Sequence, residues 1–181
     1  MKKVLTVLVA IFAVFTANAQ VAVVGGITSA SQKIKNVDVR NTSRYHAGLA
    51  YRHRLGLGFM FQPEILYNVK DMQVADFRES ATKAAYLELG AQMQWGFKLA
   101  VVRPYILAEP YLGYALSASV GDRKLNDWTD INRREAGVAF GFGVELIDHV
   151  QVSAKYFHNM EKRVNGETDA SGIAVSAAIL F

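Results

Sequence analysis

Cysteine is absent from this 181-residue chain, and proline occurs only three times. Without cysteine there is neither a disulfide framework nor the lipid-modified N-terminal cysteine of a lipoprotein. After the first 20 residues, no stretch approaches the roughly 18 apolar residues that a transmembrane helix needs. Yet 51% of the residues are hydrophobic. A chain of this kind must distribute its apolar residues with a period of two, which is the pattern of strands with one apolar face.

The first residues have the pattern of a secretory signal peptide. Two lysines precede an apolar segment from Val4 to Thr16, and Ala17-Asn18-Ala19 has the small-x-small form that signal peptidase cuts. We therefore expect residues 1–19 to be cleaved and residues 20–181, 162 in number, to form one domain. The formal net charge of +4 then falls to about +2, which gives no support to a nucleic-acid partner.

Eight segments of the remaining chain alternate apolar with small or polar residues. The expected strands cover residues 21–28, 45–53, 57–68, 84–99, 103–120, 134–146, 150–157 and 170–181. The connections between them are alternately long and short, with long polar loops at residues 29–44, 69–83, 121–133 and 158–169. Short turns on one side and long loops on the other are typical of antiparallel strands that cross a membrane.

A soluble barrel of the lipocalin type has the same period of two, so the two classes must be separated. The polar face of a soluble barrel lies outside and carries many charges. Here that face is crowded with glycine, alanine and serine, which suit the inside of a narrow eight-stranded barrel. Tyr67 and Trp95 lie near strand ends on the apolar face, where an aromatic girdle is expected. We therefore predict an all-β fold, an eight-stranded antiparallel up-and-down transmembrane β-barrel in the cell outer membrane with periplasmic termini.

The last expected strand has one apolar face and ends in an aromatic residue. Its outward residues are Ile173, Val175, Ala177, Ile179 and Phe181. We expect this strand to pair with the first, because an open sheet edge in lipid leaves backbone groups unpaired. A terminal aromatic on such a strand is a feature that barrel-assembly machinery reads, so Phe181 is the predicted assembly signal. Outer-membrane lipid and that machinery are the expected partners.

Six charged residues fall on the face that would line the lumen: Arg52, Glu64, Glu88, Glu109, Glu145 and Lys155. A charge inside a narrow barrel is costly unless it is paired. One interpretation is a polar gate or an ion path. The other is a salt-bridge network that fills the lumen, and it is favoured because eight strands leave an interior only just wide enough for side chains. Acids outnumber bases in this set, so we expect one glutamate to be protonated or bridged by water.

The four histidines raise the question of a lipid-modifying hydrolase. Such an enzyme needs a serine activated by a histidine, with an acid to orient the histidine. No serine lies two residues from any histidine in a G-x-S-x-G or comparable setting. His46 and His53 are seven residues apart in one strand and face opposite sides, which is not a metal-ligand spacing. We therefore expect no catalysis, no cofactor and no metal.

The long loops mix charged and small polar residues, as solvated loops do. Trp128 in the third of them is an aromatic of the type that anchors interfaces. It is the candidate for contact with an extracellular or envelope protein partner.

Several short motifs resemble a known family. Residues 61–67, Phe-Gln-Pro-Glu-Ile-Leu-Tyr, resemble the third-strand motif of the bacterial outer-membrane β-barrel domain family that includes PorT-like proteins. Arg103-Pro104-Tyr105, residues 141–145 and Lys155-Tyr156 look like its later strands, whereas Gly90-Ala91 stands where that pattern has a proline. The resemblance implies an eight-stranded barrel and no single shared activity.

The function expected from these observations is that of a non-enzymatic outer-membrane barrel with a packed polar lumen, which contributes to envelope integrity or surface interaction. The alternative is a small channel or a secretion-associated component, which only the resemblance to PorT-like proteins suggests. A lipid-modifying enzyme is the third class.

Overall fold

The computed structural model describes residues 19–34, 37–38, 42–72, 82–120, 123–124, 133–160 and 169–181. Within them, the long strands are β1 (Ala19–Ile34), β3 (Thr42–Gly56), β4 (Phe59–Met72), β5 (Thr82–Gly96), β6 (Val102–Val120), β8 (Arg134–Leu146), β9 (Val150–Asn159) and β10 (Asp169–Leu180). Two short strands, β2 (Val37–Asp38) and β7 (Arg123–Lys124), pair with β1 and β6. Among the described residues, no helix has the length and apolarity that crossing a membrane requires.

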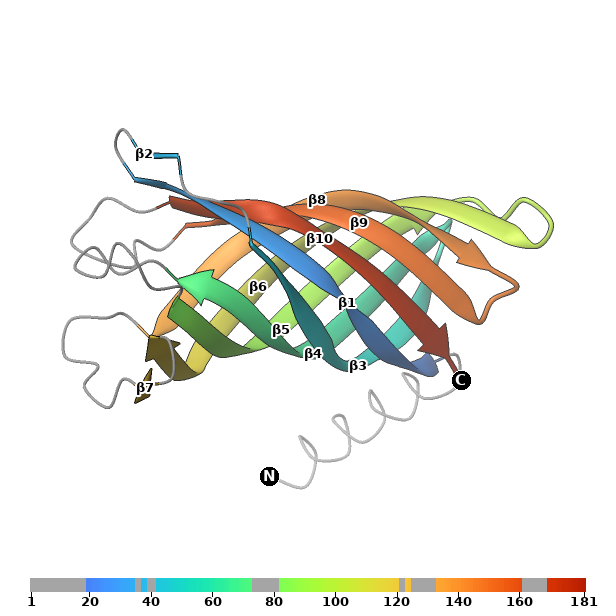
Figure 1. The fold of residues 1–181 in the computed structure, drawn as a ribbon. Coiled ribbons are helices and arrows are strands. Elements are labelled where there is room, and N and C mark those ends of the chain that lie inside the picture. Colours follow the sequence, from blue (N-terminus) through green and yellow to red (C-terminus); the bar gives the residue numbers. More distant parts are fainter. Residues whose placement is uncertain are drawn as a thin grey trace, which may run out of the picture.

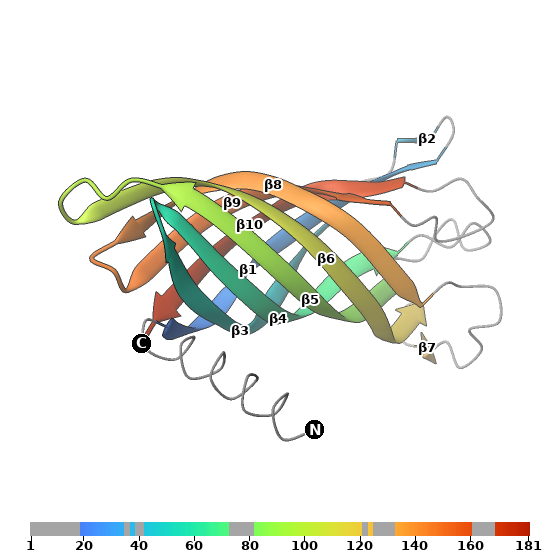
Figure 2. The ribbon, with the colours of Figure 1, turned by 180° about the vertical axis from the view of Figure 1, so that it is seen from behind.

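The eight long strands form one closed antiparallel barrel. Each pairs with its neighbour in sequence, and β1 also pairs with β10, from Ala22 opposite Leu180 to Lys33 opposite Asp169. The short turns lie together at one end, where the C-terminus of β10 is also found (Figures 1 and 2). Among the eight long strands described, closure leaves no unpaired edge to face lipid. The predicted eight-stranded fold is confirmed.

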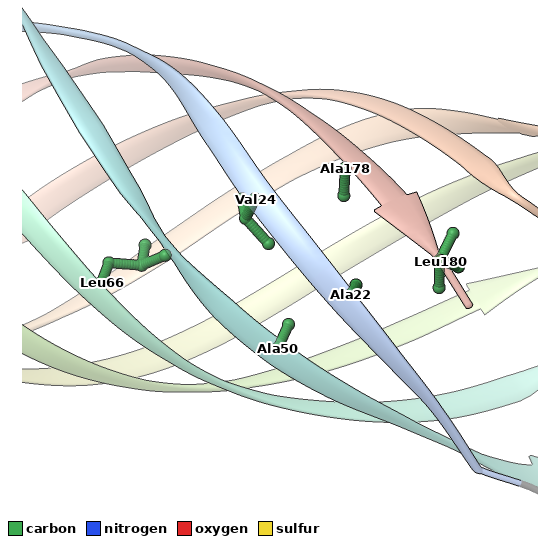
Figure 3. Close-up of a cluster of buried hydrophobic side chains, with 6 residues drawn as sticks. All are labelled: Ala22, Val24, Ala50, Leu66, Ala178 and Leu180. Carbon is green, nitrogen blue, oxygen red and sulfur yellow. The ribbon is translucent and has the colours of Figure 1, made fainter.

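The alternation of the sequence separates the two faces of the sheet. Leu49, Ile65 and Leu89 point outward and are more than half exposed, while inward neighbours such as Ala50, Leu66 and Glu88 are buried. Such an outer surface suits the hydrocarbon of a membrane. On the inside, small apolar side chains fill the space beside the seam between β1 and β10 (Figure 3): Ala22, Val24, Ala50, Leu66, Ala178 and Leu180.

Several strands extend further toward the loop end than the sequence predicted. β1 continues to Ile34 instead of Thr28, and β4 continues to Met72 instead of Asn68. Lys70, predicted to lie in a loop, is therefore a buried strand residue, and His158 belongs to β9. Backbone pairing continues past the apolar part of these strands, where polar residues resemble a loop in the sequence.

Two of the turns at the other end differ from the prediction. β3 runs to Gly56, and the turn that follows is Leu57–Gly58, with φ of 53° and 83°. β5 ends at Gly96 and not at Leu99. The bounds of β8 agree with the predicted strand, and the predicted turn at residues 147–149 is confirmed.

Candidate functional site

The candidate site is the lumen, where charged side chains form three clusters at successive depths. The middle cluster is built on Lys155 from β9. Its Nζ lies 2.8 Å from Oε1 of Glu64 and 2.6 Å from Oε2 of Glu109, and all three side chains are buried. Gln92 donates a further hydrogen bond of 3.0 Å to Glu109. One ammonium group thus joins two carboxylates from β4 and β6.

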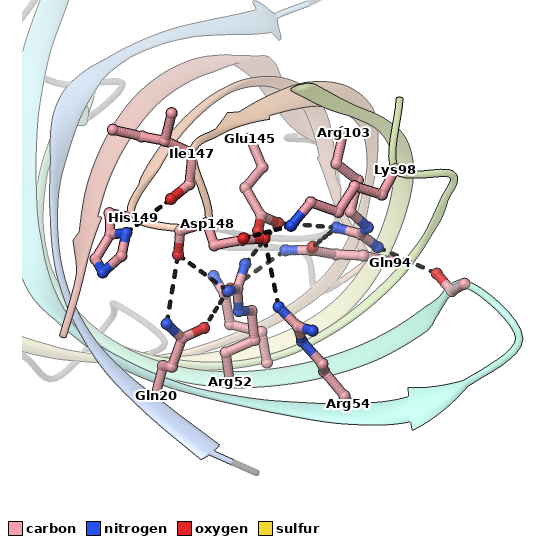
Figure 4. A network of polar contacts seen from close by, with 12 residues as sticks. Gln20, Arg52, Arg54, Gln94, Lys98, Arg103, Glu145, Ile147, Asp148 and His149 are labelled. Carbon is pink, nitrogen blue, oxygen red and sulfur yellow. Dashed lines mark hydrogen bonds and ion pairs between the residues drawn. The ribbon is translucent and has the colours of Figure 1, made fainter. Parts of the chain in front are cut away.

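The turn-end cluster reverses these signs, with two cations on one carboxylate. Glu145 Oε2 lies 2.6 Å from Arg52 Nη1 and 3.3 Å from Arg103 Nη1 (Figure 4). Arg103 also donates hydrogen bonds to Oε1 of Gln94 at 3.1 Å and to the carbonyl oxygen of Gly58 at 3.1 Å. The two guanidinium groups therefore share one carboxylate just inside the short turns.

The loop-end cluster repeats the pattern of the middle one. Lys70 forms ion pairs with Glu88 and Glu135, and all three side chains are buried. The carboxylates also accept hydrogen bonds, Glu88 from Asn68 at 2.9 Å and Glu135 from Asn159 at 3.3 Å. The Lys70 ammonium lies 5.0 to 5.6 Å from the ring centres of three aromatic residues: Tyr86, Tyr111 and Phe157. Such contacts favour a desolvated cation.

Glycines on the inner face make room for these long side chains. A Cβ on Gly90 would lie 2.7 Å from Oε1 of Glu109 and 3.0 Å from Cγ of Glu64. A Cβ on Gly113 would lie 2.6 Å from Cγ of Glu135. The small residues that the sequence analysis assigned to the lumen thus stand beside the large charged ones.

The structure therefore places all six sequence-predicted lumen residues inside the barrel and adds three more, Lys70, Arg103 and Glu135. Lys70 escaped detection because its strand was predicted to end too early, and Arg103 because it directly follows a turn. The described buried residues include five carboxylates, at positions 64, 88, 109, 135 and 145, and four cations, at positions 52, 70, 103 and 155. The buried carboxylates therefore outnumber the buried cations by one, whereas among the six predicted residues the glutamates outnumber the cations by two.

Little space is left among these side chains. A cavity of about 20 Å³ lies between the middle and loop-end clusters, and one of about 10 Å³ lies beside Glu64 and Lys155. Each has room for about one water molecule.

His46 has a serine partner far away in the sequence. Its Nε2 lies 2.9 Å from Oγ of Ser176, and its Nδ1 lies 2.8 Å from Oγ1 of Thr28. Gly26 stands between His46 and Ser176 in the register, and a Cβ there would lie 2.6 Å from Nε2. The signal was hidden because the two residues are 130 positions apart and meet only through closure of the barrel.

The described neighbours of this pair differ from those of a serine–histidine–acid triad. The side-chain partners recorded for the histidine are two hydroxyl groups, whereas a triad requires an orienting acid. Both His46 and Ser176 are buried, and the adjoining cavity holds about one water. Among the described residues, no group of three or more His, Asp or Glu side chains is arranged to hold a metal ion.

At the turn-end mouth of the lumen lies a partly exposed ion cluster. Asp148 is paired with Lys98 and lies 3.4 Å from Nη2 of Arg54 (Figure 4). The hydrogen bond from Lys98, together with the nearby positive charges, lowers the pKa of Asp148. This carboxylate therefore stays ionised at neutral pH.

The two other predicted residues lie elsewhere. Phe181 is exposed on the outer face, and its N–H donates a hydrogen bond of 2.9 Å to the carbonyl oxygen of Val21 at the seam. Trp128 lies outside the described residues.

Comparison with known families agrees with this architecture. Residues 15–162 match the model of the outer membrane protein beta-barrel domain. The chain belongs to this family. It is thus an outer-membrane β-barrel, as predicted, while its relation to PorT-like proteins stays a prediction. No curated protein matches the chain.

Solved structures of outer-membrane barrels share the fold. Neisserial surface protein A is 17% identical with a TM-score of 0.57, and the match covers 91% of this chain and 99% of that one. Ail, the attachment invasion locus protein of Yersinia pestis, is 13% identical with a TM-score of 0.53 and the same coverage. The outer membrane enzyme PagL is 13% identical with a TM-score of 0.61, covering 87% of this chain and 98% of that one. At these identities the likeness concerns the fold alone, and the fold is compatible with both catalytic and non-catalytic roles.

Proposed function

We propose that this protein is a non-enzymatic outer-membrane barrel with a closed, packed polar lumen, which contributes to envelope integrity or surface interaction. The observation that carries the proposal is the filling of the lumen by three ion clusters, with two cavities of about 20 and 10 Å³ between them. Buried, mutually paired charges restrict movement of the side chains that would have to part to admit an ion. They also fix the register of the strands that contribute them.

A deletion strain tests this role. Loss of the barrel should raise sensitivity to detergents or large antibiotics, or reduce adhesion to surfaces, while the composition of lipid A stays unchanged. Complementation with the wild-type gene should restore the phenotype, and so should a Ser176→Ala variant, because the proposal gives this hydroxyl no catalytic role. A change in lipid A acylation that wild type reverses and Ser176→Ala does not would indicate an enzyme instead.

A protein partner would narrow the role further. We propose that one binds at the loops, with Trp128 as the candidate anchor, because tryptophan is among the residues that supply most of the binding energy of interfaces. Crosslinking in intact outer membranes followed by pull-down, with wild type compared to Trp128→Ala, is the appropriate experiment. A partner captured by both proteins with equal yield would remove Trp128 from the interface.

We further propose that Phe181 serves assembly more than stability. The Phe181→Ala variant should reach the outer membrane in reduced amount, because it lacks the terminal aromatic of β10. The same variant should refold into detergent with near wild-type stability, because an exposed ring adds little to packing inside the barrel. Heat-modifiable electrophoretic mobility measures folding in both settings. An equal loss in cells and in detergent would mean that Phe181 is a structural residue of the seam.

A further inference from the structure

The outer surface of the barrel stays apolar right up to the short turns. The residues at or next to these turns include several exposed apolar side chains: Leu55, Leu57, Leu99, Val101 and Ile147. Leu57 is 92% exposed, the highest value among the exposed large apolar residues of the described chain. At the other end, described residues facing outward include polar ones such as Arg134 and Ser171.

Two of these apolar residues also occupy an unfavourable backbone conformation. Leu57 has φ of 53° and Ile147 has φ of 47°. Positive φ favours glycine, asparagine and aspartate, and it is particularly unfavourable for a β-branched residue such as isoleucine. In a turn surrounded only by water, glycine, asparagine or aspartate would fit the backbone conformation better and would expose less apolar surface. The apolar tips therefore indicate a surrounding that is itself partly apolar.

The same end carries an excess of positive charge. Arg54 and Lys98, both about half exposed, share the single carboxylate of Asp148. Behind them, Arg52 and Arg103 share the carboxylate of Glu145. Four cations therefore face two carboxylates, which leaves a net charge of +2 at this end. One of these two positive charges belongs to the partly exposed group of Arg54, Lys98 and Asp148 (Figure 4).

These two features meet at one opening. A hollow of about 280 Å³ at the turn-end mouth of the barrel is lined by charged residues, Arg54, Lys98, Arg103 and Asp148, and by apolar ones, Phe59, Met60 and Phe97. Trp95 continues the aromatic surface, with its ring centre 4.7 Å from that of Phe97 and 6.3 Å from that of Phe59. A ligand that fits must combine an anionic group with an apolar body.

We propose that this turn-end rim binds an anionic phospholipid of the leaflet around it. The phosphate lies at Arg54 and Lys98, the acyl chains pass over Phe59 and Phe97, and the apolar turn tips rest in the interfacial layer. Basic residues attract anionic headgroups at this depth, and aromatic rings favour the same layer. This interaction goes beyond the proposed function and does not depend on it.

Tryptophan fluorescence tests the proposal directly. The chain has two tryptophans, so Trp128→Phe leaves Trp95 as the only reporter. The protein is reconstituted in vesicles of phosphatidylcholine and phosphatidylglycerol in which one lipid or the other carries bromine as a quencher. Brominated phosphatidylglycerol should quench Trp95 more strongly, with a relative association constant of about five. This is the factor expected for one net positive charge at an anionic surface.

Substitutions in this background should change the preference in opposite directions. Arg54→Gln with Lys98→Gln should abolish it, because Asp148 would then repel the phosphate. Asp148→Asn should raise it about fivefold further, since it frees both cations and asparagine tolerates the φ of 64° at that position. Arg134→Gln, at the loop end, is the control and should leave the preference unchanged.

Three results would overturn the proposal. The first is an unchanged preference in the Arg54→Gln, Lys98→Gln variant. The second is a lower preference in Asp148→Asn, which would mean that the ion pairs are needed only to hold the rim together. The third is competition by inorganic phosphate at constant ionic strength, which would show a site for free anions and not for lipid.

A second measurement locates the turn tips. Because the chain lacks cysteine, Leu57→Cys gives a single labelling site, and Arg134→Cys gives a matched site at the loop end. An environment-sensitive fluorophore on residue 57 should be quenched by brominated lipid and shielded from iodide, in contrast to the label on residue 134. If iodide quenched both labels equally, the turn tips would not lie in lipid, which would contradict the proposal. Their apolar side chains would then be explained by contact with a protein partner.

Discussion

Replacing Lys155 with Met should lower the free energy of unfolding in bilayers by about 3 to 5 kcal/mol. The ammonium group of Lys155 joins Glu64 and Glu109 in the middle of the lumen, and all three side chains are buried. Its removal leaves two carboxylates facing each other with no cation between them. Urea-induced unfolding of the barrel in lipid vesicles, followed by tryptophan fluorescence, measures the change.

A matched variant separates loss of pairing from loss of volume. Combining Lys155→Met with Glu64→Gln and Glu109→Gln removes the whole charged cluster and keeps similar side-chain sizes. This triple variant should recover most of the lost stability, since a buried ion cluster replaced as a unit is often nearly neutral. If Lys155→Met alone left stability unchanged, the charges would be hydrated, and the lumen would be a water-filled pore.

Val175→Arg should destabilise the folded barrel by about 2 to 4 kcal/mol in any bilayer. Val175 lies on the outer face of β10, opposite Ile27 of β1, where hydrocarbon surrounds the barrel. An arginine at that depth must either desolvate its charge or distort the bilayer around it. The same unfolding measurement applies, and the effect should diminish in thinner bilayers.

The neighbouring inward positions provide the control for this prediction. Ser176→Leu would break the hydrogen bond to His46 and crowd a buried position, and Ala174→Leu would crowd another. Both should destabilise by overpacking, in the range of about 1 to 3 kcal/mol. A neutral Val175→Arg combined with tolerance of both leucines would mean that the inside and outside faces are assigned the wrong way round.

The period of two made most of this fold predictable. Strand β8 alternates without interruption from Arg134 to Leu146, and its predicted bounds agree with the structure. Prediction was poorer where the apolar signal ends. Lys70 follows the last outward aromatic of β4, Tyr67, and a lysine there resembles the start of a loop. Its buried position depends on two glutamates from β5 and β8, which local sequence cannot reveal.

The candidate site was predictable as a list of charges and not as a set of pairs. Alternation alone places Arg52 and Glu145 on the inner face, but only strand register and barrel closure bring them to 2.6 Å. The contact between His46 and Ser176 has the same origin, since it crosses Gly26 at the seam of β1 and β10. Long-range register is a property of the whole barrel, so these contacts had no local signal in the sequence.

Single-channel recording in planar bilayers tests the central claim, a lumen closed by its own side chains. The purified protein is inserted, and insertion is verified by protease protection and heat-modifiable mobility. Because three ion clusters lie in series along the lumen, we predict no unitary current steps above the bilayer baseline at moderate voltage. Reproducible steps from inserted wild-type protein, with an ion selectivity that changes in Lys155→Met, would contradict the claim and identify the barrel as a small channel.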